Sequence, residues 1–312
     1  MGAMTVVTAG LLTTVQDEGR WGWQSRGVPV AGPMDPQSHR MANALVGNTA
    51  GAAGLEVSFA GPELAFDDLR IIAVSGGVWD VTVGGRAVPM NTAVEAAVGQ
   101  RVRLGTRRRG SRAYVAVDGG IDVPLVFGSR STHVRGAMGG FEGRALRAGD
   151  RVPLGQGGRT PFLRTSNLKK GYEPLSRAPV RILPGPHLNR LRADTLDLLQ
   201  SAPYTVSARS DRMGFRLAGP RLAHRGQTEM LSAPTAFGAI QVPPSGEPIV
   251  LMADRQTMGG YPIAATIISA DIGIAGQLGP GDAVAFTVCT LQEAMTALIA
   301  QEQTLMAVQV GR

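Results

Sequence analysis

Two Asp-Arg dipeptides in the C-terminal half of the sequence carry side chains that could bind a small anion. Asp211-Arg212 follows the β-like run YTVSARS, and Asp254-Arg255 follows the apolar run IVLMA. Adjacent residues of a strand point to opposite faces, so the Asp and the Arg of one dipeptide are not expected to pair. Each side chain must then find its partner in another segment, in another subunit or in a ligand. These four residues are the predicted catalytic candidates, and a turn with a solvated Asp-Arg pair is the alternative.

Polar residues and glycines continue the chain after the second dipeptide. A guanidinium beside exposed backbone N–H groups suits a carboxylate or a phosphate, and glycine lets the backbone approach an anion closely. The stretch therefore predicts a loop that binds a small carboxylate substrate, although a hydrophilic turn would also explain it. Its predicted substrate-binding residues are Gln256, Thr257, Gly259, Gly260 and Tyr261.

Two N-terminal segments combine charge and glycine in a similar way. Residues 15–35 hold Asp17 and Arg20, and residues 127–140 hold Arg130 beside a later Gly-Gly pair. We predict that these three residues also contribute to substrate binding. A local ion pair in a turn explains Asp17 and Arg20 equally well. Asp35 precedes a proline and is better explained as a helix N-cap.

The basic character of the chain does not by itself indicate a nucleic-acid partner. The net charge is +7, but aromatic residues are only 5% of the chain, which is poor for base stacking. The arginines are dispersed, and the dense run TRRRGSR at 106–112 is predicted to be a solvated hairpin tip. The single cysteine and the four histidines, none of which forms a His-x-x-x-His or similar pair, predict no metal site. No apolar run approaches about 18 residues, so we expect a cytoplasmic protein without a membrane partner.

Short β-prone runs closed by glycine or aspartate dominate both halves of the sequence, which predicts a mainly β fold. Residues 79–90 predict a hairpin with a Gly84-Gly85 turn, and helices are predicted after Asp35-Pro36, over 187–200 and over 290–308. FAGPELAF (59–66) resembles LAGPRLAH (217–224), which favours two related domains. The predicted boundaries are 1–155 for the first domain, 156–177 for a linker and 178–312 for the second domain, which includes a C-terminal helix.

The sequence contains no complete catalytic set. It has no Gly-x-Ser-x-Gly elbow, no Walker loop and no dinucleotide-binding fingerprint. This absence favours a subunit whose site is completed by a partner.

Several long motifs, taken together, resemble one family. They are TVQDEGRWGWQSRGVPVAGPMD, ANALVGN, VDGGIDVPLVFGSRST, SDRMGFRLAGP and GAIQVPPSGEPIVLMADRQTMGGYP. The chain is identified as a member of the allophanate hydrolase subunit 2 family. That family is also called the biotin-dependent carboxyltransferase C-terminal-type family, the kinase-inhibitor antagonists and the 5-oxoprolinase C subunits.

The resemblance implies a fold of two cyclophilin-like β-barrel domains with a few short helices. It also implies a partner of the allophanate hydrolase subunit 1 type (the 5-oxoprolinase B subunit) and a third 5-oxoprolinase subunit. The leading expectation is a subunit, inactive alone, of an ATP-dependent hydrolase that converts 5-oxoproline to glutamate, with ATP used by the complex. One alternative is the carboxyltransferase component of a biotin-dependent, urea carboxylase-like system. The other is a regulatory antagonist that binds a subunit 1-type kinase inhibitor.

The resemblance also marks the candidate positions for the proposed chemistry. On this view Arg212 or Arg255 holds the substrate carboxylate or a phosphorylated intermediate. Asp211 or Asp254 orients that arginine or the attacking group. Gly259 and Gly260 supply backbone donors to a developing oxyanion.

Overall fold

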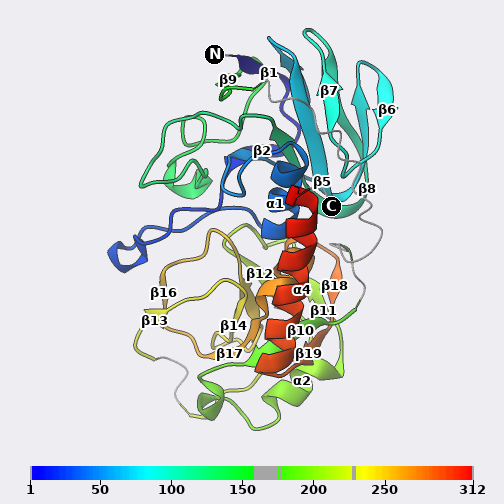
Figure 1. Ribbon diagram of the computed structural model, residues 1–312. Coiled ribbons are helices and arrows are strands. Elements are labelled where there is room, and N and C mark those ends of the chain that lie inside the picture. The colour runs from blue at the N-terminus through cyan, green and yellow to red at the C-terminus, as the bar shows by residue number, and fades with distance from the viewer. Residues whose placement is uncertain (1, 158–174, 176–177, 227–229, 311–312) are drawn as a thin grey trace. The chain divides into compact units, whose positions relative to one another are not determined.

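The computed structural model describes residues 2–157, 175, 178–226 and 230–310, and it divides into two compact units (Figure 1). Unit 1 comprises Met1–Trp21, Ala31–Leu175 and Gln301–Arg312, and unit 2 comprises Gly22–Val30 and Ser176–Ala300. The predicted mainly β class is confirmed, since two large sheets form most of the described structure. The predicted domain boundaries stay a prediction, and the proposed linker lies almost wholly outside the described residues.

Unit 1 is built on a nine-stranded antiparallel sheet that curls around one apolar core. Its path runs β2-β3-β8-β4-β1-β9, and β5 pairs with β6, β7 and β8. The strands are β1 (Ala3–Thr8), β2 (Leu12–Gln16), β3 (Gly54–Ser58), β4 (Glu63–Phe66), β5 (Arg70–Val83), β6 (Arg86–Val88), β7 (Val94–Ala96), β8 (Arg101–Val117) and β9 (Arg151–Pro153).

The two longest strands, β5 and β8, lie side by side and form the framework of unit 1 (Figure 1). Their register shifts three times between Gly76 and Val81, and such irregularities let a long pair bend. One end of β8 pairs with β4 and the other with β3, so the bend curls the sheet around its core. The predicted hairpin is confirmed: Val83 faces Arg86 across a turn with positive φ at Gly84 and Gly85.

The arginine-rich run at 106–112 was predicted to be a hairpin tip, but it forms the middle of β8. Arg107 and Arg109 face Trp79 and Val78 of β5 in the ladder. The prediction was wrong because charge and glycine resemble turn signals, whereas pairing with β5 keeps this stretch extended.

Helix α1 (Pro36–Leu45) begins as its sequence signals require. The Asp35 carboxylate accepts a hydrogen bond from Ser38 N at 3.0 Å, and Pro36 occupies the first turn. The buried face of α1 packs with residues of β5, β8 and the end of α4 (Leu291–Val310) in a second apolar cluster. Arg40 of α1 also forms a two-point ion pair with Glu302 of α4, at 2.5 and 2.8 Å.

Unit 2 contains an eight-stranded sheet in the order β18-β11-β12-β15-β14-β17-β10-β19. The edge strands β18 and β19 are consecutive in the chain, separated by Ala285 alone, so the path returns to its start and forms a nearly closed barrel. A separate pair, β13-β16, lies outside this sheet. The strands are β10 (Val180–Pro184), β11 (Tyr204–Val206), β12 (Gly214–Ala218), β13 (Ala233–Pro234), β14 (Ala239–Gln241), β15 (Ile249–Leu251), β16 (Met258–Gly259), β17 (Ile263–Ile267), β18 (Ala283–Val284) and β19 (Phe286–Val288).

The remaining helices confirm one prediction and correct another. Helix α4 begins with the predicted capping box, in which Glu293 N donates to Thr290 Oγ1 and Thr290 N donates to the Glu293 carboxylate. The predicted helix over 187–200 is wrong: only α2 (Thr195–Ser201) is α-helical there. Leu191 is extended, fully buried and bridged to His224, so a tertiary pairing interrupts the leucine pattern. A short helix, α3 (Ile272–Gly276), was not predicted.

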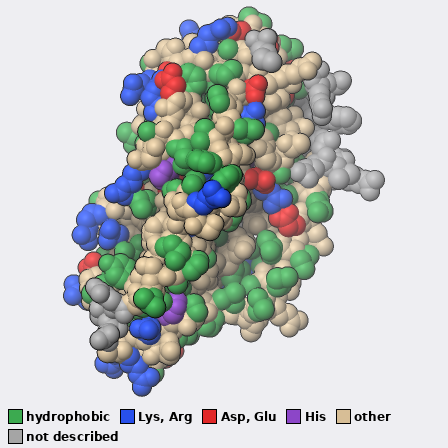
Figure 2. Space-filling view, turned by 90° about the vertical axis from the view of Figure 1, so that its left-hand side faces the viewer, with side chains coloured by type: hydrophobic (Ala, Val, Ile, Leu, Met, Phe, Trp, Pro, Cys, Tyr) green, Lys and Arg blue, Asp and Glu red, His purple; other side chains and the backbone are tan. Residues whose placement is uncertain are grey.

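Basic side chains stand at several separate places on the face drawn in Figure 2, without gathering into one patch. No described helix is both long enough and apolar enough to cross a membrane.

Candidate functional site

The two Asp-Arg dipeptides are brought together by the pairing of β12 with β15. Gly214 faces Leu251 in this antiparallel ladder, and the backbone bonds continue beyond the strands. Met252 N donates to Met213 O at 2.9 Å, and Asp254 N donates to Arg212 O at 2.8 Å. The register of β12 and β15 therefore places the two copies of the dipeptide opposite each other.

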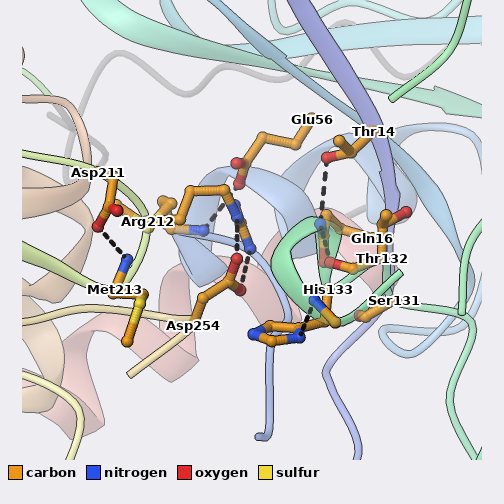
Figure 3. Close-up of polar contacts among 12 residues, drawn as sticks. Thr14, Gln16, Glu56, Ser131, Thr132, His133, Asp211, Arg212, Met213 and Asp254 are labelled. Carbon is orange, nitrogen blue, oxygen red and sulfur yellow. Dashed lines mark hydrogen bonds and ion pairs between the residues drawn. The ribbon is translucent and has the colours of Figure 1, made fainter. Parts of the chain in front are cut away.

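Arg212 and Asp254 form a buried ion pair across this register (Figure 3). Arg212 Nε and an NH2 hydrogen each donate to one Asp254 oxygen at 3.0 Å, and the two residues are 7% and 5% exposed. This two-point geometry is the strongest arrangement for the pair. We expected each side chain to find its partner outside its own dipeptide. For Arg212 and Asp254 that partner is in the other dipeptide. A catalytic role for either residue stays a prediction.

Asp211 has a local structural contact. Its Oδ1 accepts hydrogen bonds from Met213 N at 2.8 Å and Gly214 N at 3.3 Å (Figure 3). The side chain is exposed, and it closes the turn that leads into β12 in the manner of an Asx turn.

Arg255 differs from the other three residues of the dipeptides. It is 6% exposed, and its NH1 nitrogen is buried without a hydrogen-bond partner among the described residues. Its guanidinium lies 5.4 Å from the ring centroid of Phe237, which is a cation–π contact. Burial lowers the pKa of Arg255 to about 10, so the group is still a cation at neutral pH. A buried cation with an unused donor has the chemistry to bind an anion.

The segment after Arg255 is fixed to the segment that carries Phe237. Thr235 Oγ1 donates to the carbonyl oxygen of Gln256, and Thr235 N donates to Thr257 O at 3.0 Å. Gln256 Nε2 also donates to Oε1 of Gln241 at 3.2 Å. These bonds hold the backbone on both sides of Gln256, and they fix the residue that follows Arg255.

The other predicted substrate-binding residues of unit 2 lie next to this framework. Gly259 faces Ala233 in the β13-β16 pair, and Gly260 O accepts a hydrogen bond from Met230 N at 3.3 Å. Tyr261 is 39% exposed. Contact of these residues with a substrate stays a prediction.

Asp17 of unit 1 is the centre of a saturated hydrogen-bond cluster. Its carboxylate accepts bonds from Ser129 Oγ and Ser131 Oγ at 2.6 Å, from Arg130 N at 2.5 Å and from Gly19 N at 2.9 Å. Burial acts to raise the pKa of Asp17, but these bonds outweigh it and hold the pKa below its usual value. Asp17 thus connects two loops, and the predicted local ion pair with Arg20 is not what holds it.

Arg20 and Arg130 are also held by their own unit. Arg20 is 1% exposed and donates to the carbonyl oxygens of Val126 and Ser131. Arg130 donates to Val123 O at 2.8 Å and to Asp122 at 2.7 Å. Through these contacts both arginines anchor loops of unit 1. Their role in substrate binding stays a prediction.

Sequence reasoning missed three residues of the unit 2 cluster, namely Thr235, Phe237 and Gln241. The available signal was Gln241 in the apolar run GAIQV, where an amide in a buried strand requires polar partners. It also missed a buried network in unit 1, in which Glu56 accepts bonds from Tyr114 Oη and Met34 N, each at 2.8 Å (Figure 3 draws Glu56).

The two cavities described in unit 1, of 260 and 370 Å³, are not lined by the predicted site residues. Among the described residues, no group of three or more His, Cys, Asp or Glu side chains is placed to hold a metal.

Known proteins are similar to this chain over nearly its whole length. Residues 26–288 match the family described as carboxyltransferase domain, subdomain A and B. The chain is 38% identical over 295 residues to the 5-oxoprolinase C subunit of Escherichia coli, covering 94% of each protein. It is 35% identical to the 5-oxoprolinase C subunit of Haemophilus influenzae, covering 90% of this chain and 89% of that protein. The crystal structure of the urea amidolyase of K. lactis superposes with a TM-score of 0.88 at 31% identity. That match covers 98% of this chain and 20% of the amidolyase.

Proposed function

Since the chain belongs to the carboxyltransferase-domain family, subdomains A and B, we propose that it acts as the C subunit of a 5-oxoprolinase. The observation that carries this proposal is the match to the 5-oxoprolinase C subunit of E. coli, which covers 94% of both chains. In the proposed reaction 5-oxoproline, ATP and two water molecules give glutamate, ADP and phosphate. The chain works with 5-oxoprolinase subunits of the B type and of a third type, and ATP is used by the complex.

Arg255 is the residue proposed to bind the carboxylate of 5-oxoproline. Its buried, unpartnered NH1 is a donor with a positive charge, and Phe237 supports its flat side chain. A carboxylate that docks there compensates the charge and gains charge-assisted hydrogen bonds, each worth about 1.5–3 kcal/mol. Arg212 has a supporting role, because its guanidinium is already bonded to Asp254. This ion pair fixes the residue that precedes Arg255.

A reconstituted complex tests the function and the role of Arg255 together. The chain is purified with its B-type and third subunits, and glutamate formation from 5-oxoproline is followed with and without ATP. We expect ATP-dependent turnover, and about a 100-fold loss of kcat/KM for Arg255→Met with the complex still assembled. Arg255→Lys keeps the charge but loses the planar donor pair, so it should retain intermediate activity. A fully assembled wild-type complex without turnover would contradict the enzyme function.

Carboxyl transfer is the second candidate, and the family description and the urea amidolyase relatives favour it. The Arg255 site fits this reaction as well, because a carboxyl donor or product is also an anion. The two candidates separate by cofactor: carboxyl transfer requires a biotinylated carrier and bicarbonate-derived carboxyl groups. Turnover that depends on biotin, with no 5-oxoproline hydrolysis, would replace the first candidate with the second.

A further inference from the structure

Gln241 has an unusual position for an amide side chain. It lies on β14, between β15 and β17, and is 2% exposed. Its Oε1 accepts a hydrogen bond from Gln256 Nε2 at 3.2 Å, which assigns the oxygen to that contact. Its Nε2 is buried and has no hydrogen-bond partner among the described residues. An unused buried amide donor is costly to the fold, so its retention calls for a partner outside the described chain.

Gly259 lies close to this donor, and it can do so because it has no side chain. A Cβ at position 259 would lie 2.5 Å from Gln241 Nε2, 3.2 Å from Thr235 Cγ2 and 3.4 Å from Gln256 Nε2. The first of these distances is too short for a real contact, so any side chain here would displace the amide. The φ of Gly259 is not in the left-handed region, and glycine is therefore required here for space and not for backbone conformation.

The Gln241 donor and the Arg255 donor belong to one bonded framework. Gln256 follows Arg255 in the chain, and its side chain hydrogen-bonds to Gln241. The Gln256 carbonyl accepts a hydrogen bond from Thr235. Thr235 lies two residues before Phe237, the ring against which Arg255 packs. The framework thus presents one cationic donor and one neutral donor, both buried and both unused among the described residues. This combination suits a ligand with a carboxylate for the cation and a neutral carbonyl oxygen for the amide.

We propose that Gln241 is a specificity-determining residue that donates a hydrogen bond to a neutral carbonyl oxygen of the substrate whose carboxylate binds Arg255. The inference rests on the proposed function and names the substrate class more closely: small carboxylates that carry a lactam or amide carbonyl. Gln256 is the positioning residue, because it occupies the Gln241 oxygen and thereby aims the nitrogen. Carboxylates without a carbonyl leave Nε2 unpaired and bind more weakly.

Two half-substrates test the assignment in the assembled complex. L-Proline has the carboxylate without the ring carbonyl, and 2-pyrrolidone has the carbonyl without the carboxylate. Each is used as a competitive inhibitor of 5-oxoproline turnover. Gln241→Met should raise the KM for 5-oxoproline and the inhibition constant of 2-pyrrolidone about tenfold, and should leave that of L-proline unchanged. Arg255→Met should give the opposite pattern, weakening L-proline and sparing 2-pyrrolidone.

The controls separate recognition from general damage to the barrel. Gln277 is 3% exposed and lies outside the cluster, so Gln277→Met should leave both inhibition constants unchanged. Gly259→Ala, which displaces the amide without removing it, should reproduce the loss for 2-pyrrolidone. If Gln241→Met weakens both half-substrates equally, or neither, the assignment of Gln241 is wrong while the proposed function stands. A wild-type complex that does not turn over 5-oxoproline would overturn both.

Discussion

The same dipeptide, Asp-Arg, occurs twice in unit 2, and the fold gives its two copies different surroundings. Arg212 of the first copy is paired at two points with Asp254 of the second. Asp211 closes a turn, whereas Arg255 keeps a buried nitrogen without a partner among the described residues. Residue type therefore does not separate a structural charge from a candidate binding charge. What separates them is whether the strand register supplies a partner.

The two copies also differ in how the cost of burying their charges is compensated. An ion pair compensates its own burial within the chain, and its geometry then fixes the two segments against each other. An unpaired cation is compensated only when a ligand arrives, so its burial favours binding at the expense of stability. Substitutions in the two copies should therefore have different effects on stability.

The largest effect is expected from breaking the ion pair. Asp254→Ala removes the buried carboxylate that Arg212 engages at two points, so the free energy of unfolding should fall by about 3–5 kcal/mol. Urea unfolding of the purified chain measures this change. Asp254→Asn keeps an oxygen acceptor and the side-chain shape and should lose less. If Asp254→Ala cost under about 1 kcal/mol, the pair would not be a main structural contact between β12 and β15.

A smaller effect is expected at the exposed Asp211. Asp211→Ala removes the exposed carboxylate that accepts from Met213 N and Gly214 N, so the loss should be about 1 kcal/mol. Asp211→Asn retains the oxygen and serves as the matched variant. Thermal unfolding followed by circular dichroism is sufficient. A loss of turnover with normal stability would contradict the structural role and give Asp211 a place in the chemistry.

The smallest effect on stability is expected at Arg255. Arg255→Met replaces a buried cation, which has no ionic partner among the described residues, by an apolar chain of similar length. Removing the uncompensated charge stabilises the fold and losing the Phe237 contact destabilises it, so the free energy of unfolding without ligand should change by less than about 1 kcal/mol. The same urea measurement used for Asp254→Ala provides the direct comparison. A loss as large as that of Asp254→Ala would show that Arg255 has a structural partner and would remove it as a carboxylate ligand.

The sequence predicted the elements whose signals are local. The Asp35-Pro36 start of α1, the Thr290 capping box and the Gly84-Gly85 turn each depend on a few neighbouring residues. It failed where distant segments decide the structure: β5 keeps the arginine run of β8 extended, and His224 pairs with Leu191 and interrupts the expected helix.

For the candidate site, the sequence by itself determined that two Asp-Arg pairs follow β-like runs and that adjacent strand residues cannot pair with each other. It also marked Arg255, Gln256 and Gly259 through their glycine-rich context and their family motif. Only the tertiary structure decided that Arg212 takes Asp254 as its partner, that Arg255 keeps a buried nitrogen without a hydrogen-bond partner among the described residues, and that Gln241 joins the cluster. The physical reason is that hydrogen bonds and ion pairs are satisfied by contacts in space. The strands β12, β14 and β15 bring those contacts together from positions far apart in the chain.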